Sequence, residues 1–246
     1  MTHPAPASWN APPTGPAKAR YVERMFSHIV PHYDLMNWLM TGGRMTAWRR
    51  MTARTASAGR RGDGLDVATG TGDLAFSLAS QPGIERVVGV DFCADMVYAA
   101  QGKVRQRGLQ RKVELVVGDG LCLPFADASF VCATIGFGLR NVSDIPQALS
   151  EMCRVLAPGG RVAILELTPL RPGFFATLFR WYFQGIVPIL GRLLARDYDA
   201  YAYLFPSMVA FPPADELCRM MEAIGLREVN YRRIALCTVA IHVGTR

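Results

Sequence analysis

Two glycines and a carboxylate at fixed spacing form the part of this chain best suited to chemistry. Gly70 and Gly72 follow an apolar run, and a helical pattern begins directly after them near Asp73. Glycines in such a strand–turn–helix unit let the backbone approach a ligand closely, because they carry no Cβ atom. Asp91 ends the next apolar run, where a carboxylate can accept hydrogen bonds from ribose hydroxyls. The unit therefore predicts a nucleoside-binding site.

The spacing of these residues leaves the kind of nucleoside open. Gly70, Gly72 and Ala75 also fit the fingerprint of dinucleotide-binding turns, so a nicotinamide cofactor remains an alternative. A third apolar run, 113–118, ends in another acid, Asp119. Acids thus end three successive strands, at Asp66, Asp91 and Asp119. This pattern resembles that of the S-adenosylmethionine-dependent methyltransferases. In that family the glycine-rich turn lies by the methionine part of the cofactor, the second acid holds the ribose, and the third contacts the adenine amine.

The methyltransferase resemblance implies S-adenosylmethionine as the cofactor and a set of residues around it. The expected cofactor-binding residues are Asp66, Ala68, Thr69, Gly70, Thr71, Gly72, Asp91, Phe92, Asp119, Gly120 and Gly136. No metal ion is expected, because methyl transfer from this cofactor needs none.

The elements that must position these residues alternate between strands and helices. Apolar patterns predict strands at 64–68, 86–91, 113–118, 130–136 and 161–167, helices at 73–80, 94–107, 144–156 and 213–224, and final strands at 227–235 and 238–244. We expect Pro158-Gly159-Gly160 to end the helix before the fifth strand. The order indicates an α/β fold with a parallel sheet, helices on both faces and ligands at the carboxyl ends of the strands. The resemblance implies a Rossmann-like class I methyltransferase fold with seven strands, mostly parallel, and the last strand antiparallel.

Two helical regions lie outside this alternation. Residues 17–39 read as a helix that Pro31 interrupts, a second basic helix follows at 45–58, and together 17–61 are expected to form a lid. Residues 168–212, after the fifth strand, form an apolar and aromatic helical insertion, which is either an amphipathic lid or an ordinary core helix. Arg180, Gln184 and Pro188 interrupt its apolar stretch, which argues against a membrane span. We expect a flexible tail at 1–16 and a single methyltransferase domain at 17–246.

Composition and charge narrow the setting of the protein. The six cysteines show no C-x-x-C pair, which favours reduced thiols in a cytoplasmic protein, and no signal peptide is seen. Residues 17–61 hold nine basic side chains and two acids, an excess equal to the net charge of +7 of the whole chain. Such a region can bind an anionic membrane surface or simply be solvated. Nucleic acid is not expected, because no RNA-binding aromatic motif accompanies the charge.

Several further segments resemble one family, the ubiquinone/menaquinone biosynthesis C-methyltransferases, in particular those like demethylmenaquinone methyltransferase. The segments are Tyr33-Asp34-Leu35-Met36-Asn37 with Trp48, Gly136-Phe137-Gly138-Leu139-Arg140-Asn141-Val142, and Arg154 to Arg161 continuing to Glu166. The resemblance runs from about Tyr21 to Gly244. It implies methylation of a ring carbon of a polyprenylated quinol: demethylmenaquinol, a methoxybenzoquinol, or both. The chain departs from the family at Met45, Gly136 and Cys237, where histidine, serine and glycine are usual.

The candidate catalytic residues are Tyr33, Arg140 and Asn141. Arg140 follows the fourth strand, where its cation could stabilise a phenolate or organise a water that takes the proton. Asn141 and Tyr33 could hydrogen-bond the oxygens of the quinol. A purely structural alternative is that Arg140 pairs with Asp144 and that Tyr33 only packs the lid.

Three other functions remain open at this stage. The chain could methylate a different small molecule, transfer hydride with a nicotinamide cofactor, or bind quinones without catalysis. The leading interpretation is a cytoplasmic quinol methyltransferase that associates peripherally with the inner face of the cell membrane. A homodimer is left open.

Overall fold

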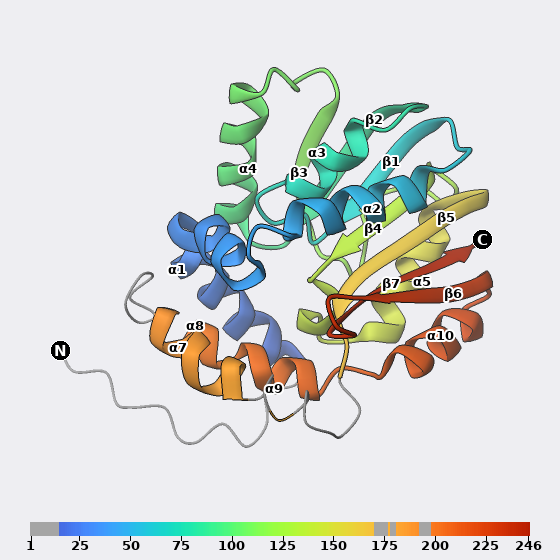
Figure 1. Cartoon of the computed structure of the whole chain (residues 1–246). Helices are drawn as coiled ribbons and strands as arrows, with labels where there is room; N and C mark the ends of the chain where they lie inside the picture. The colour runs from blue at the N-terminus through green and yellow to red at the C-terminus, as the bar shows by residue number, and fades with distance from the viewer. Residues whose placement is uncertain (1–14, 170–176, 178–180, 192–197) are drawn as a thin grey trace.

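The core of the protein is a sheet of seven strands, shown in Figure 1. The computed structural model describes residues 15–169, 177, 181–191 and 198–246. The strands are β1 (Gly62–Val67), β2 (Ile84–Asp91), β3 (Val113–Val117), β4 (Phe130–Gly136), β5 (Leu156–Leu167), β6 (Arg227–Ile234) and β7 (Val239–Thr245). Their order is β3-β2-β1-β4-β5-β7-β6, and β7 runs antiparallel to its neighbours β5 and β6. The mostly parallel seven-stranded sheet and its antiparallel last strand are confirmed.

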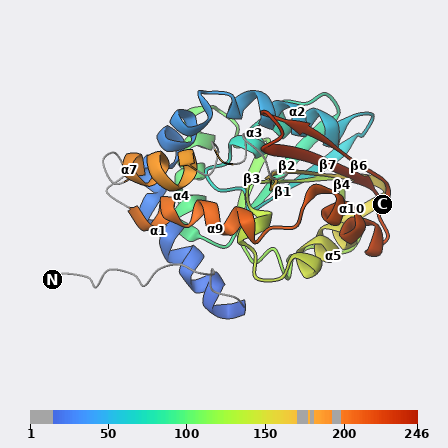
Figure 2. The same cartoon turned by 60° about the horizontal axis from the view of Figure 1, so that its bottom comes forward.

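Helices cover both faces of the sheet. They are α2 (Met45–Ser57), α3 (Asp73–Ala79), α4 (Ala94–Gln106), α5 (Ile145–Val155) and α10 (Ala214–Ala223). Helices α2, α3 and α4 share one apolar core, and α5 and α10 share another; Figure 2 shows α2 and α3 on one face of the sheet and α5 and α10 on the other. Each observed helix lies within a residue or two of its predicted range, because its apolar side chains recur at helical spacing.

The first helix, α1 (Gly15–Thr41), is continuous through Pro31, so the predicted interruption is wrong. A proline inside a helix removes one backbone hydrogen bond and costs about 3 kcal/mol. Packing on both sides of the proline offsets this cost, because Val22 and Ile29 before it and Met36 after it are buried in one apolar cluster. Tertiary packing here overrides local propensity.

Pro158-Gly159-Gly160 does not end the helix as expected, since α5 ends earlier, at Val155, and these residues lie within β5. Strand β5 pairs with β4 on both sides of them, from Phe130–Leu156 to Cys132–Arg161, with a register shift between the two pairs. A Cβ atom on Gly160 would lie 2.7 Å from the carbonyl oxygen of Ala157. The glycine therefore lets the chain bulge and return to the sheet, which a turn-based interpretation of the sequence cannot anticipate.

The described part of the 168–212 insertion is helical. It comprises η2 (Tyr182–Ile186), α7 (Val187–Leu190), α8 (Tyr198–Ala202) and α9 (Leu204–Val209); its residues 170–176, 178–180 and 192–197 lie outside the described residues, as do 1–14 of the expected tail. Tyr201 and Tyr203 are buried against α1, whereas Trp181 and Ile189 are exposed. The insertion thus combines the two alternatives: one part packs inward like a core helix, and another part exposes apolar side chains like an amphipathic lid. Across the described residues, no helix has the length and apolar character needed to cross a bilayer.

The turn between β6 and β7 has an unusual backbone. Ala235, Leu236 and Cys237 follow one another with φ of 51°, 53° and 69°, the left-handed region that side chains with a Cβ atom avoid. Each such residue costs about 1–2 kcal/mol relative to an ordinary conformation. Cys237 occupies the position where the resembling family has glycine, so the structure gives that departure a physical consequence.

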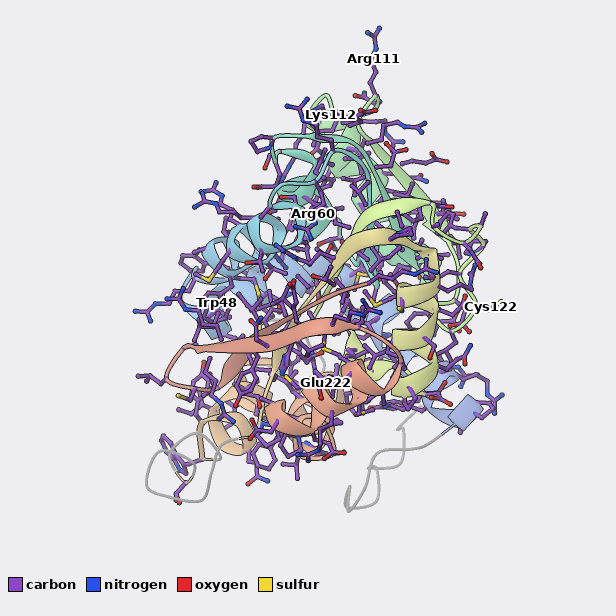
Figure 3. All side chains as sticks on the ribbon, turned by 90° about the vertical axis from the view of Figure 1, so that its right-hand side faces the viewer. Trp48, Arg60, Arg111, Lys112, Cys122 and Glu222 are labelled. Atoms are coloured by element: carbon purple, nitrogen blue, oxygen red, sulfur yellow. The ribbon has the colours of Figure 1, made fainter. Side chains whose placement is uncertain are left out.

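We expect Cys237→Gly to raise the free energy of unfolding by about 1 kcal/mol, because glycine adopts a positive φ without strain. The matched control is Cys122→Gly, at a second exposed free cysteine whose φ is not positive (Figure 3). There the greater freedom of the unfolded chain should lower the free energy of unfolding by about 0.5 kcal/mol. Urea unfolding of the wild type and the two variants measures both changes. Equal changes in the free energy of unfolding at the two sites would show that the backbone at Cys237 is not strained.

Candidate active site

The glycine-rich turn is held by the carboxylate of Asp91. Asp91 Oδ2 accepts a hydrogen bond of 2.7 Å from the backbone N–H of Gly70, and its Oδ1 accepts one of 2.9 Å from the N–H of Cys93. Gly72 lies at the N-terminus of α3 with φ of 87°, and a Cβ atom there would lie 2.6 Å from the ring of Phe76. The two glycines and the acid therefore form one preorganised unit, as their spacing predicts.

A cavity opens beside this unit at the carboxyl ends of β1, β2, β3 and β4. Seven of the predicted cofactor-binding residues line it: Ala68, Gly70, Asp91, Phe92, Asp119, Gly120 and Gly136. Helix α1 covers the cavity with Ala19, Phe26 and Tyr33. We call this space the nucleoside cavity. It lies at the carboxyl edge of the sheet, where open α/β sheets generally bind their ligands.

Three of the other four predicted cofactor-binding residues line a second, smaller space. Asp66, Thr69 and Thr71 line a small hollow that adjoins the nucleoside cavity and also contains Arg49. Asp66 is buried and accepts hydrogen bonds of 2.7 Å from the hydroxyls of Thr69 and Thr134. Burial raises the pKa of Asp66 to about 6, and the two hydroxyl hydrogen bonds oppose the rise. Gly72 lines neither space.

Charged contacts fasten α1 and α2 over the turn. Asp34 of α1 forms an ion pair of 2.6 Å with Lys103 of α4, and Arg49 of α2 forms one of 2.7 Å with Asp73 of α3. At the other end of α1, Lys18 Nζ donates hydrogen bonds of 2.8 and 2.7 Å to the carbonyl oxygens of Arg140 and Val142. Sequence reasoning missed these contacts, because each joins residues that are distant along the chain.

A second, larger cavity of about 560 Å³ lies next to the first. It is enclosed by α1, α2, α8, α9 and the β6–β7 turn, and its lining is mostly apolar. The two cavities share four residues: Phe26, Tyr33, Phe137 and Asn141. We call the larger space the acceptor cavity. Two of the three predicted catalytic residues, Tyr33 and Asn141, therefore lie where the cavities meet, and the third, Arg140, lines the acceptor cavity.

Arg140 pairs with Glu166 and not with Asp144. Arg140 Nη1 donates hydrogen bonds of 2.6 Å to Glu166 Oε1 and to the carbonyl oxygen of Phe137, and both charged side chains are buried. Asp144 instead caps α5 by accepting a hydrogen bond from the N–H of Gln147. The sequence alone could have indicated Glu166 as a site residue, because it is a fourth acid, after Asp66, Asp91 and Asp119, near the end of an apolar strand.

Three residues that line the acceptor cavity have a buried polar atom with no hydrogen-bond partner among the described residues: Arg140 Nε, Asn141 Oδ1 and Tyr203 Oη. Asn37 lines the same cavity, and its side chain hydrogen-bonds Tyr33. A buried polar group without a partner is destabilising, so native structures rarely keep one except where a ligand or water completes it. Three such atoms around a mostly apolar cavity indicate an apolar ligand that carries a few polar atoms.

Comparison with known proteins agrees with this geometry. The profile described as the ubiE/COQ5 methyltransferase family matches residues 15–246. A protein named demethylmenaquinone methyltransferase from Thermus thermophilus is 45% identical over 90% of this chain and 100% of its own length, and one of the same name from Roseiflexus sp. strain RS-1 is 44% identical over 93% of this chain and 94% of its own. The solved structure of the [4+2]-cyclase SpnF is 18% identical, with a TM-score of 0.70, and the match covers 96% of this chain and 98% of that one. At that identity SpnF shows the fold alone.

Proposed function

The chain belongs to the ubiE/COQ5 methyltransferase family, and on that premise we propose that it methylates a ring carbon of a polyprenylated quinol, demethylmenaquinol in the first place. It is an S-adenosylmethionine-dependent methyltransferase, which sets aside the nicotinamide alternative. The acceptor is the proposed part, and the three unpartnered polar atoms on the wall of the acceptor cavity carry it. A quinol ring has an apolar body and two oxygens, as that wall requires.

The residues at the carboxyl edge fit the cofactor. Ala68 and Gly70 of the turn line the nucleoside cavity with little or no side chain, so a ligand can approach the backbone closely there, and Asp91 lies where the ribose hydroxyls can reach its carboxylate. Asp119 and Gly120 line the far side of that cavity, where the adenine ring would lie. The hollow holds the carboxylates of Asp66 and Asp73 and the guanidinium of Arg49, which is ion-paired with Asp73, and groups of both signs suit the ammonium and carboxylate of an amino acid.

Asp66 yields a pH-dependent prediction for cofactor binding. With a pKa of about 6, close to half of its carboxyl groups are protonated at pH 6. An ammonium group bound beside Asp66 favours its ionised form. Binding of S-adenosylhomocysteine should therefore release up to about half a proton from Asp66 at pH 6 and none at pH 8. Calorimetry in two buffers of different ionisation enthalpy measures the release, and Asp66→Asn should abolish it. Identical heats in both buffers at pH 6 would place the ammonium elsewhere.

Carbon methylation requires an electron-rich ring carbon in line with the methyl group. When bound, S-adenosylmethionine supplies that methyl group on a positively charged sulfur. Arg140 stabilises the negative charge that develops on the quinol oxygen as its proton passes to a water, and this charge passes to the neighbouring ring carbon, which forms the new C–C bond and then loses its own proton to water while the oxygen is protonated again. Tyr33 and Asn141 orient the ring, because they line both cavities. Residues 17–61 act as a lid that excludes water, with α1 lying over both cavities.

An anionic membrane surface is the second partner in this proposal. The acceptor cavity reaches the surface at Gly42, Arg44 and Leu236, three exposed residues that also line it. Trp38 is 60% exposed, and its ring packs on Gly43 of the same α1–α2 turn. An exposed tryptophan, an exposed leucine and an arginine around the mouth suit the interface of a bilayer, from which a prenyl tail could enter. We call these residues the rim.

The rim predicts reversible binding to vesicles that contain phosphatidylglycerol, weakened by salt because screening reduces the contribution of the basic residues. Trp38→Ser/Leu236→Ser should lower the vesicle affinity about tenfold, since two apolar side chains no longer leave water. The control is Arg111→Gln/Lys112→Gln, at the start of β3 on the opposite edge of the sheet (Figure 3), and it should bind as the wild type does. Equal losses of vesicle affinity in both variants, or a wild type that stays in the supernatant at low salt, would show that the rim does not bind the membrane.

A methylation assay tests the proposed function. The wild-type enzyme with S-adenosylmethionine is offered short-tailed demethylmenaquinol and, separately, the methoxybenzoquinol of ubiquinone synthesis, both kept reduced. We expect the naphthoquinol to gain one methyl group by mass spectrometry with the higher kcat/KM. Turnover of neither quinol would show that the acceptor is a different small molecule.

A further inference from the structure

Tyr203, on the wall of the acceptor cavity, has a buried hydroxyl that the fold itself does not use. The residue links α8 to α9 and is only 2% exposed, and its ring packs against Tyr21 with the ring centres 5.4 Å apart. Its Oη has no hydrogen-bond partner among the described residues. A phenylalanine could make the same packing contacts without burying an unpaired hydroxyl.

The surroundings of Tyr203 keep this hydroxyl protonated, so that it can donate a hydrogen bond. Burial raises the pKa of Tyr203 to about 12, with smaller electrostatic effects from Arg140 and Glu166. The side chain therefore keeps its proton at neutral pH and lies within electrostatic range of the buried ion pair. Arg140 Nε, the unpartnered donor of that pair, lines the same cavity.

We propose that Tyr203 is a further substrate-binding residue, whose hydroxyl donates a hydrogen bond to an oxygen of the acceptor ring. The proposal rests on the proposed quinol acceptor and adds to it a residue beyond Tyr33, Arg140 and Asn141. The unpartnered donors on the wall are then Arg140 Nε and Tyr203 Oη. Donors set around an apolar space bind oxygen-bearing rings and discriminate against rings of the same shape without oxygens, because each donor would otherwise stay unpaired.

Two probes of the same shape separate this role from simple packing. Menadione has a methylated naphthalene ring system with two carbonyl oxygens, whereas 2-methylnaphthalene has no oxygens. Binding of each to the wild type saturated with S-adenosylhomocysteine is followed by quenching of tryptophan fluorescence, since Trp48 lines the cavity, and is checked by calorimetry. The variants are Tyr203→Phe and, as a control, Tyr98→Phe, which removes the hydroxyl of a tyrosine that is 64% exposed and lines neither cavity.

Tyr203→Phe should bind menadione about five- to tenfold more weakly and 2-methylnaphthalene with unchanged affinity. Its melting temperature should be no lower than that of the wild type, because the variant loses an unpaired polar group and no contact. Tyr98→Phe should match the wild type in both affinities.

Two outcomes overturn the inference. If Tyr203→Phe loses affinity for both probes by the same factor, Tyr203 is structural. If it binds menadione as tightly as the wild type does, another donor holds the oxygen. A wild type that itself shows no preference for menadione contradicts the proposed quinol acceptor, and the failure of the proposed function is thereby distinguished from failure of the role of Tyr203.

Discussion

Glu166→Ala is expected to lower the free energy of unfolding by about 3–5 kcal/mol, because it leaves the buried guanidinium of Arg140 without a counter-charge. Glu166 also accepts hydrogen bonds from the backbone N–H groups of Arg140 and Leu167, which lose their acceptor in the variant. Chemical denaturation with linear extrapolation measures the change.

A double variant separates the charge from the rest of the side chain. Arg140→Met/Glu166→Leu removes both charges together and replaces them with apolar groups of similar length. Its loss of stability should be smaller than that of Glu166→Ala, since removing a whole buried ion pair is often close to neutral whereas removing one partner is not. A cost of less than about 1 kcal/mol for Glu166→Ala would show that the pair is not buried as the structure has it.

Arg140→Lys is expected to lower kcat for quinol methylation by about 10²–10³, with the affinity for S-adenosylhomocysteine nearly unchanged. The size of the effect follows from losing a donor aimed at the oxygen on which charge develops. Lysine keeps the charge, so Glu166 retains a partner and the fold is preserved, but it lacks the planar fork that can bind the carboxylate and the acceptor together. Steady-state kinetics gives kcat, and calorimetry gives the cofactor affinity.

The matched control for Arg140→Lys is Arg161→Lys. Arg161 is an arginine of β5 that donates a hydrogen bond to the carbonyl oxygen of Thr55 and lines neither cavity. It should keep kcat within about twofold of the wild type. Turnover like that of the wild type in Arg140→Lys would assign Arg140 a purely structural role.

The part of the fold that the sequence predicts is the part specified by local pattern. Apolar runs with an acid at their ends predict β1, β2 and β3, and Gly70 and Gly72 predict the turn that Asp91 holds. Pro31 and the Pro158-Gly159-Gly160 segment were wrongly interpreted because local propensity was allowed to decide, whereas buried contacts of α1 and pairing of β5 with β4 decide in the folded chain.

The candidate site was predictable as a list of residues and not as an arrangement. Ala68, Asp91 and Asp119 meet in one cavity because parallel strands bring their carboxyl ends to one edge. Nothing in the spacing of the chain assigns Glu166 to Arg140, or brings Tyr203 to the same cavity from the insertion after β5. Such pairings depend on how the insertion and α1 pack over the sheet, and long-range packing leaves no periodic signal in a single sequence.

Carbon-13 NMR of the reaction product tests the central claim most directly. The wild-type enzyme is given S-adenosylmethionine labelled with carbon-13 in its methyl group, together with short-tailed demethylmenaquinol. A ring held by its oxygens at the wall of the acceptor cavity, with charge passed to the neighbouring carbon, should take the label only as a methyl group on the ring carbon next to that oxygen. Label found as a methoxy group, or absent from the quinol, would contradict the account.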